Sequence, residues 1–197
     1  MCNRNRSYSR QLQASRLQGF TLVELLVVMA VVAVLASVAA PSLQKFVTQR
    51  AVTARADELA SALRLARSEA LKRGSVVSLC ACASPQAATP SCSDAADWAK
   101  GWLVFTDSNV NGSIDSTSGD QVLAAHVPQA SVKSLVAKDA SGVAKAFTGF
   151  HPNGIAATGS AVFTIEPNIS SSDGSYAASH RRVEHNLQGR VQVLAGL

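Results

Sequence analysis

Residues 19–41 of this 197-residue chain read GFTLVELLVVMAVVAVLASVAAP, and this stretch decides how the rest of the chain is organised. Within the 21 residues of 20–40 a single side chain, Glu24, is charged. A helix of that length at ~1.5 Å per residue matches the hydrocarbon core of a bilayer, about 30 Å thick. The stretch therefore predicts one membrane-spanning helix, with Pro41 at the end of its apolar run.

The basic charge of the chain lies almost wholly in front of this helix. The chain has 18 Lys and Arg against 13 Asp and Glu, a formal net charge of +5. Residues 1–19 hold four arginines and no acid, so residues 20–197 sum to +1, from 14 basic and 13 acidic side chains. Because positive flanks stay in the cytoplasm, we expect a cytoplasmic N-terminus and the bulk of the chain on the other side.

Glu24 needs a polar surrounding or a cationic partner. A carboxylate inside a spanning helix costs about 2–4 kcal/mol. Near the helix end its side chain could reach lipid headgroups. Cutting the chain between Gly19 and Phe20 would instead create an α-amine four residues before Glu24. That amine could pair with the carboxylate of the same helix or of a neighbouring subunit.

Residues 19–26, GFTLVELL, resemble the processing site of type IV pilins and type II secretion pseudopilins. The resemblance implies that a prepilin peptidase cuts after Gly19 and, acting as an N-methyltransferase, methylates Phe20. It also implies that Glu24 recruits and registers subunits in a filament, and that Pro41 kinks the helix. The implied partners are that enzyme, other major and minor pilins or pseudopilins, the inner-membrane assembly platform, and membrane lipid before assembly.

Helical patterning continues beyond Pro41. The spacing of three and four residues predicts one buried stripe on a helix, formed by Val52, Ala56, Leu59, Leu63, Ala66 and Ala70. Charged residues, Arg55 among them, lie largely off this stripe, and Gly74 is a typical helix stop. The predicted helix runs from residue 20 to about residue 73, with residues 41–74 as its amphipathic continuation.

Past residue 74, alternation and short apolar runs are typical of strands. We predict eight, near residues 76–83, 101–106, 121–127, 131–137, 145–151, 161–166, 181–184 and 190–194. Residues 85–97, 107–120 and 168–178 are predicted loops. The fold class is α+β, a long N-terminal helix packed on a C-terminal antiparallel β-sheet domain. Its predicted parts are a cleaved leader (1–19), a spanning helix (20–40), the helix continuation (41–74) and the β-rich domain (75–197).

Five segments further resemble the GspH/FimT (FimU-like) branch of minor pilins and pseudopilins. They are ARSEA at 66–70, VVSLC at 76–80, GWLVFTD at 101–107, FHPNG at 150–154 and GRV at 189–191. This resemblance implies a pilin-like fold and a low-abundance subunit that primes assembly at or near the filament tip. A few members of the branch act in DNA uptake, so a DNA-binding minor pilin is the alternative function.

Three cysteines remain once the leader, which holds Cys2, is removed: Cys80, Cys82 and Cys92. An oxidising compartment favours a disulfide. We favour Cys80 with Cys92 and leave Cys82 with Cys92 open. Either closes a loop of about a dozen residues, worth about 2–3 kcal/mol. A zinc site would need a fourth ligand.

Residues 107–115, DSNVNGSID, follow the first nine positions of a calcium-binding loop. The candidate ligands are Asp107, Asn109, Asn111 and Asp115. The twelfth position, however, is Ser118 instead of a bidentate glutamate, and no helices flank the loop. We favour a hairpin loop whose side chains bond their own backbone, and we keep calcium as the one possible cofactor.

Basic residues gather near the C-terminus, at His180, Arg181, Arg182, His185 and Arg190. In DNA-uptake members of the branch, a Gly-Arg-x-Arg element supplies DNA contacts. Here residues 189–192 read GRVQ and lack the second arginine. Because strand faces alternate, only one of Arg181 and Arg182 would share a side with Arg190. We therefore favour a solvated strand end over a DNA site.

The chain carries no catalytic motif. It has no nucleophile elbow, zinc-protease pair, phosphate-binding loop or dinucleotide fingerprint. Its hydrophobic content of 47% excludes intrinsic disorder, and a single long apolar run excludes a polytopic membrane protein. We expect a non-enzymatic subunit of the bacterial inner membrane, with its C-terminal domain in the periplasm, that is later built into a pilus or pseudopilus.

Overall fold

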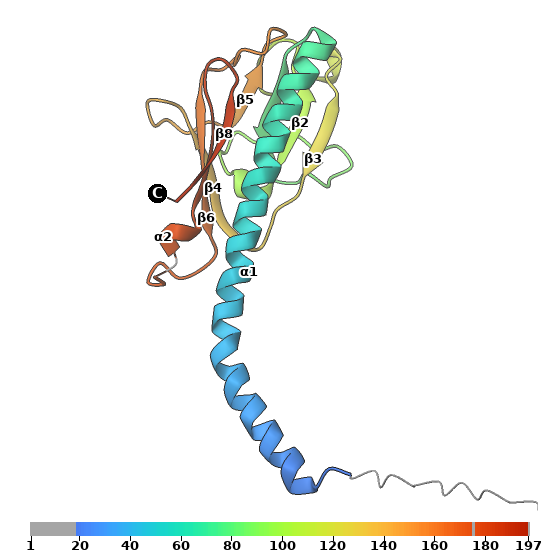
Figure 1. Ribbon diagram of the computed structural model, residues 1–197. Helices are drawn as coiled ribbons and strands as arrows, with labels where there is room; N and C mark the ends of the chain where they lie inside the picture. Colours follow the sequence, from blue (N-terminus) through green and yellow to red (C-terminus); the bar gives the residue numbers. More distant parts are fainter. Residues whose placement is uncertain (1–18, 175, 197) are drawn as a thin grey trace, which may run out of the picture. The chain divides into compact units, whose positions relative to one another are not determined.

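The computed structural model describes residues 19–174 and 176–196 (Figure 1). The chain divides into two compact units, Met1–Pro41 and Ser42–Leu197. The predicted leader lies outside the described residues, apart from Gly19.

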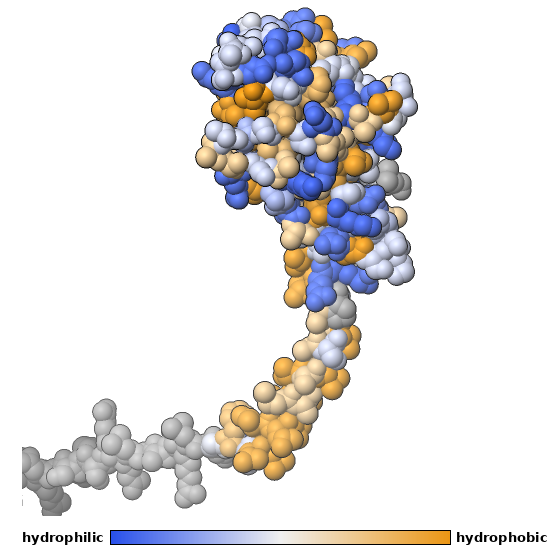
Figure 2. Space-filling model, turned by 180° about the vertical axis from the view of Figure 1, so that it is seen from behind, coloured by the Kyte–Doolittle hydropathy of each residue, from blue (hydrophilic) through white to orange (hydrophobic). Residues whose placement is uncertain are grey.

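One long helix, α1 (Leu22–Arg73), belongs to both units. Its bounds agree with the predicted helix to within two residues, and Pro41 is one of its helical residues. In the first unit its large apolar side chains are exposed, and Figure 2 shows them covering the visible face of this segment. Among the described residues, α1 is the helix long and apolar enough to cross a membrane. The predicted kink at Pro41 stays a prediction.

The second half of α1 packs on the β-rich domain. All six residues of the predicted stripe are fully buried. They share one hydrophobic core with Trp98 and with residues of both sheets, including Leu79, Trp102, Leu135, Phe150 and Phe163. The stripe is therefore the face by which the helix is fixed to its domain.

The strands form two antiparallel sheets. The first has the order β3-β2-β1-β5, with β1 (Val77–Ala81), β2 (Trp102–Thr106), β3 (Val122–His126) and β5 (Phe147–Phe150). The second has the order β4-β6-β7-β8, with β4 (Val132–Lys138), β6 (Ala161–Pro167), β7 (Arg181–His185) and β8 (Val191–Ala195). All eight strands lie where the sequence predicts them, with ends that differ by at most two residues.

Three short helical turns interrupt the connections: η1 (Trp98–Lys100), η2 (Ser116–Ser118) and α2 (Tyr176–Ser179). The sequence analysis placed η2 and most of α2 in loops. The backbone N–H of Ala99 donates to Asp97, which caps η1. Trp98 from η1 is buried in the core, where its ring meets Phe163 edge-on and its indole N–H donates to the Lys145 carbonyl at 2.8 Å.

Candidate functional site

The residues predicted for processing and assembly lie in the first turn of α1 and just before it. The backbone N–H of Glu24 donates to Thr21 Oγ1 at 3.2 Å, and the N–H of Leu25 donates to the Thr21 carbonyl at 3.2 Å. Thr21 is therefore the N-cap, and Thr21 with Glu24 has the Thr-x-x-Glu order of a capping box. This role of Thr21 was not predicted, although the Thr-x-x-Glu order is visible in the sequence.

Two consequences follow for this segment. Glu24 occupies the third position of the helix, where the helix dipole favours a carboxylate. Gly19 and Phe20 precede the helix, and Phe20 is 80% exposed. The peptide bond predicted to be cut thus lies outside regular secondary structure, and cutting it would leave the cap at Thr21 in place.

Arg67 joins α1 to two distant turns. Its Nε donates to the Gly154 carbonyl at 3.0 Å, and its Nη2 donates to the Gln188 carbonyl at 3.1 Å. Gly154 and Gly189 have φ values of 79° and 74°, which favour glycine. A Cβ on Gly189 would also lie 2.1 Å from the Gly154 carbonyl oxygen and 2.9 Å from Arg67 Nε. Three of the segments that carried the family resemblance, 66–70, 150–154 and 189–191, therefore meet at one contact.

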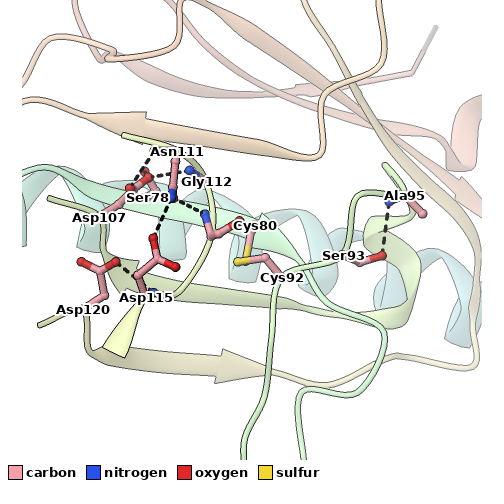
Figure 3. Close-up of a disulfide and its surroundings, with 11 residues drawn as sticks. Ser78, Cys80, Cys92, Ser93, Ala95, Asp107, Asn111, Gly112, Asp115 and Asp120 are labelled. Atoms are coloured by element: carbon pink, nitrogen blue, oxygen red, sulfur yellow. Dashed lines mark hydrogen bonds between the residues drawn. A yellow bond between two sulfur atoms is a disulfide. The ribbon is translucent and has the colours of Figure 1, made fainter. Parts of the chain in front are cut away.

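A disulfide joins Cys80 of β1 to Cys92, the pairing that the sequence analysis favoured (Figure 3). Their Cα atoms are 5.5 Å apart, and the bridge closes the connection between β1 and η1. Cys82 is a free, buried thiol in a small cluster with Cys80, Leu103 and Phe105. Residues two apart on a strand share a side, so strand alternation alone does not choose between Cys80 and Cys82.

The candidate calcium loop is tied together by its own hydrogen bonds (Figure 3). The buried Asp107 carboxylate accepts from the backbone N–H groups of Asn111 (3.0 Å) and Gly112 (3.1 Å), and from the Ser78 hydroxyl (2.8 Å). Asp115 Oδ2 accepts from the side-chain amides of Asn109 (3.1 Å) and Asn111 (2.7 Å). These two bonds hold the pKa of Asp115 below its usual value. The carboxylates thus already organise the hairpin loop, and calcium binding stays a prediction.

The predicted basic cluster at the C-terminus does not form one surface. His180 and His185 are buried. Arg181 donates to the carbonyls of Ala178 (2.9 Å) and His180 (2.8 Å), and Arg182 pairs with Glu184 at 3.2 Å.

Arg190 lies at the other end of the β7–β8 hairpin from Arg181, which pairs with Ala195. At about 3.3 Å per residue, the steps from Arg181 to His185 already span ~13 Å. The hairpin register therefore separates Arg190 from Arg181 and Arg182, so the three predicted DNA-contacting arginines are not brought together at one site.

Arg55 is buried, contrary to the expectation that it lies off the packed face of α1. Its guanidinium carbon sits 3.8 Å from the Trp102 ring centroid, and its side chain is 2% exposed. Glu58 links Arg55 Nη1 (2.9 Å) to His126 Nδ1 (2.7 Å), and the His126 ring stacks on Trp102. Burial acts to raise the pKa of Glu58, but the hydrogen bonds from His126 and Arg55 outweigh it and lower this pKa. The group fixes α1 to the first sheet.

A second polar group links the two sheets. The Thr148 hydroxyl of β5 lies 2.8 Å from Nε2 of His185 in β7 and 3.2 Å from the Thr158 hydroxyl. Lys145 donates to the Thr158 carbonyl and hydroxyl. Burial, together with a smaller effect of the Lys145 charge, lowers the pKa of His185 to about 4. Burial also lowers the pKa of Lys145.

The polar groups around Glu58 and around Thr148 both link elements of the fold to one another. Within residues 19–174 and 176–196, no group of three or more His, Cys, Asp or Glu side chains is placed to hold a metal ion. His185 is 1% exposed, so its ring is closed to an outside substrate. Two surface features of the described chain bear on its assembly: the exposed apolar first half of α1, and the surface around the exposed Arg190 and the half-buried Arg67.

Two family models match the chain. Residues 55–189 match the family model described as type II transport protein GspH, and residues 15–40 match that of the prokaryotic N-terminal methylation motif. No curated protein sequence matches the chain.

Two solved structures are similar in fold. A crystal structure of type IV minor pilin FimU from Pseudomonas aeruginosa (strain PAO1, space group P21) has a TM-score of 0.52 and 24% identity, covering 76% of this chain and 92% of that chain. A second FimU crystal form, in space group P65, gives 0.49 and 24%, with 72% and 91% covered. At this identity the first likeness shows the fold, a pilin-like α+β arrangement of a long N-terminal helix on antiparallel sheets.

Proposed function

We propose, from the premise that the chain belongs to the GspH family of type II transport proteins, that it primes filament assembly at or near the tip. As a member of this structural, non-enzymatic family, the chain is a minor pilin or pseudopilin of a type IV pilus or type II secretion system. FimU, which is similar in fold, is a type IV minor pilin, and this supports a minor subunit here.

The contrast between the two units is the observation that supports a place for this chain in a filament. The second unit buries its apolar residues around the second half of α1. The first unit exposes large apolar side chains from Phe20 to Val38 on one helix. Such a surface needs lipid or other apolar helices to cover it. We propose that inner-membrane lipid covers it before assembly and that neighbouring pilin helices cover it in the filament.

Glu24 sets the register in this proposal. After cleavage behind Gly19, the new α-amine of Phe20, N-methylated by the prepilin peptidase, lies four residues before the Glu24 carboxylate. In a low-dielectric core an unpaired carboxylate is costly, so pairing with an amine favours one axial position of neighbouring helices. The assembly platform of the inner membrane would receive the chain with its second unit in the periplasm.

Replacing Glu24 by Ala tests this role. We expect Glu24→Ala to be processed and methylated as the natural chain is, because the N-cap at Thr21 is retained, and to be recovered at lower yield in sheared filaments. Mass spectrometry reports processing, and quantitative immunoblotting of the filament and membrane fractions reports incorporation. Asp94→Asn, which removes an exposed charge from the second unit, is the matched control. Unchanged filament incorporation of Glu24→Ala would refute the register role.

A further inference from the structure

A groove between α1 and the β7–β8 turn concentrates positive charge. Its volume is about 370 Å³. Three arginines line it, Arg64 and Arg67 from α1 and Arg190 from the turn, together with Ser68, Leu71, Gly189 and Val191. None of these lining residues is acidic. Here the groove is called the arginine groove.

Two of the three guanidinium groups are available to an outside ligand. Arg67 is held by the Gly154 and Gln188 carbonyls and forms a fixed wall. Arg64 and Arg190 are exposed, and the described residues give their side chains no hydrogen bond or ion pair. Glu69, the neighbouring acid on α1, is already paired with Lys72 (3.1 Å) and Arg73 (2.8 Å). The groove therefore holds like charges without a counter-charge, which favours an anionic ligand.

The composition of the groove favours carboxylates over a nucleic-acid backbone. Arginine binds a carboxylate through two parallel hydrogen bonds, and Leu71 and Val191 offer apolar contact to the methylene groups of acidic side chains. A nucleic-acid strand would need a longer row of free cations. Arg181 and Arg182, the candidates to extend such a row, are engaged elsewhere.

We infer that the arginine groove receives an acidic segment, one rich in Asp or Glu, of a neighbouring filament subunit. The inference rests on the proposed function, which supplies the neighbour. The groove lies between α1, the helix that anchors the subunit, and the β7–β8 turn. An acidic segment bound there would therefore contact both elements at once. Arg64 and Arg190 contact the acidic segment, and Arg67 positions the Gly189 turn that carries Arg190.

The test uses the processed chain, residues 20–197, in detergent micelles, with a labelled hexaglutamate peptide as the probe. Fluorescence anisotropy at low and at physiological ionic strength gives the peptide Kd. We expect Arg64→Glu/Arg190→Glu to weaken binding at least about tenfold, the size expected for losing charged hydrogen bonds. The matched control Lys133→Glu/Lys138→Glu makes the same change in net charge on exposed residues of β4 and should keep the Kd. Thermal melting followed by circular dichroism verifies that each variant is folded, and Arg64→Gln/Arg190→Gln serves if the reversal does not fold.

Three results would overturn the inference. The first is no peptide binding at low ionic strength. The second is an equal loss in the lysine control, which would show that net charge alone attracts the peptide. The third is a tighter complex with a thymidine oligonucleotide of equal charge, which would assign the groove to nucleic acid. Peptide binding and the filament incorporation of Glu24→Ala are independent measurements. A negative result in one can therefore be told apart from a negative result in the other.

Discussion

Arg67 shows why one residue type is required at a junction between distant segments. The planar guanidinium donates to two carbonyls at once, those of Gly154 and Gln188. It fits there because Gly154 and Gly189 have no Cβ, which would lie close to the Arg67 side chain. A lysine has a single ammonium on a flexible stem and cannot reproduce that fork. The contact therefore depends on three residues that are far apart in sequence.

We expect Arg67→Lys to lower the free energy of unfolding by about 1–3 kcal/mol, since a single ammonium leaves either the buried Gly154 carbonyl or the exposed Gln188 carbonyl without its donor. Gly189→Ala should cost at least as much, because its Cβ would meet the Gly154 carbonyl oxygen at 2.1 Å. Urea unfolding followed by circular dichroism measures both, with Arg64→Lys as the control. Equal stability of Arg67→Lys and Arg64→Lys would contradict the account of this junction.

His185 links stability to pH. Burial and the nearby Lys145 lower its pKa from 6.5 to about 4 in the folded chain, so the unfolded chain binds more protons between these pH values. The contribution of His185 to the free energy of unfolding is therefore complete above pH 6.5. It is lost as the pH falls toward 4, a decrease of about 3 kcal/mol for this one group. The lowered pKa of Glu58 acts at lower pH, below its ordinary value of 4.5.

Urea unfolding at a series of pH values across this range, compared between the natural chain and His185→Gln, measures the effect. Glutamine can still bond the Thr148 hydroxyl but does not titrate. We expect a clearly shallower fall of stability with pH in the variant. Identical slopes in the two proteins would show that His185 is not responsible.

At the scale of elements, the loop between β2 and β3 depends on one buried carboxylate. Asp107 receives three hydrogen bonds, one of them from Ser78 in β1, whereas Asp115 is exposed to a much greater degree and bonds only within the loop. We expect Asp107→Ala to lose about 2–3 kcal/mol of stability, since it orphans buried donors, and Asp115→Ala to lose less than half of that. Thermal melting of both variants gives the comparison.

The same measurement tests the calcium alternative. If the loop is organised by its own bonds, adding calcium leaves the melting temperature of the natural chain unchanged, because ligand binding would raise it. A calcium-dependent rise that Asp115→Ala abolishes would show instead that the loop is a metal site.

The elements that depend on local periodicity were predictable from sequence. The buried stripe of α1 follows a helical repeat, and each strand is marked by alternation between turns, so all eight were found. Their division into two sheets was not predictable, because strand pairing joins residues far apart in sequence. Arg55 was placed wrongly for a related reason. An arginine can lie on the apolar face of a helix when its guanidinium stacks on an aromatic ring, here that of Trp102. Trp102 is far from Arg55 in sequence, so this contact forms only in the folded chain.

The candidate sites also differ in whether they are formed by neighbouring residues or by residues far apart in sequence. The residues from Gly19 to Glu24 form one local motif, which the sequence shows directly. The Arg67 junction and the arginine groove each join α1 to the β7–β8 turn, and a sequence read in order does not reveal them. The basic residues near the C-terminus do not form one surface, because His185 points inward from β7 and the register of β7 with β8 separates Arg181 from Arg190.

At the scale of the whole molecule, charge and hydropathy assign separate tasks to the parts of the chain. The positive charge sits mainly in residues 1–19, which the proposed processing removes, and leaves a nearly neutral chain of +1. The second unit has its own core, and the first unit exposes apolar side chains along α1. Both features fit the proposed sequence of events, in which the helix is first inserted into a membrane and then transferred into a filament.

The measurement that tests this most directly is mass spectrometry of the N-terminus of the chain recovered from sheared filaments. The account predicts that the chain is present in this fraction, that it begins at Phe20, and that Phe20 carries an N-methyl group. A chain that keeps its leader, that is cut elsewhere, or that is found only in the membrane fraction would contradict it.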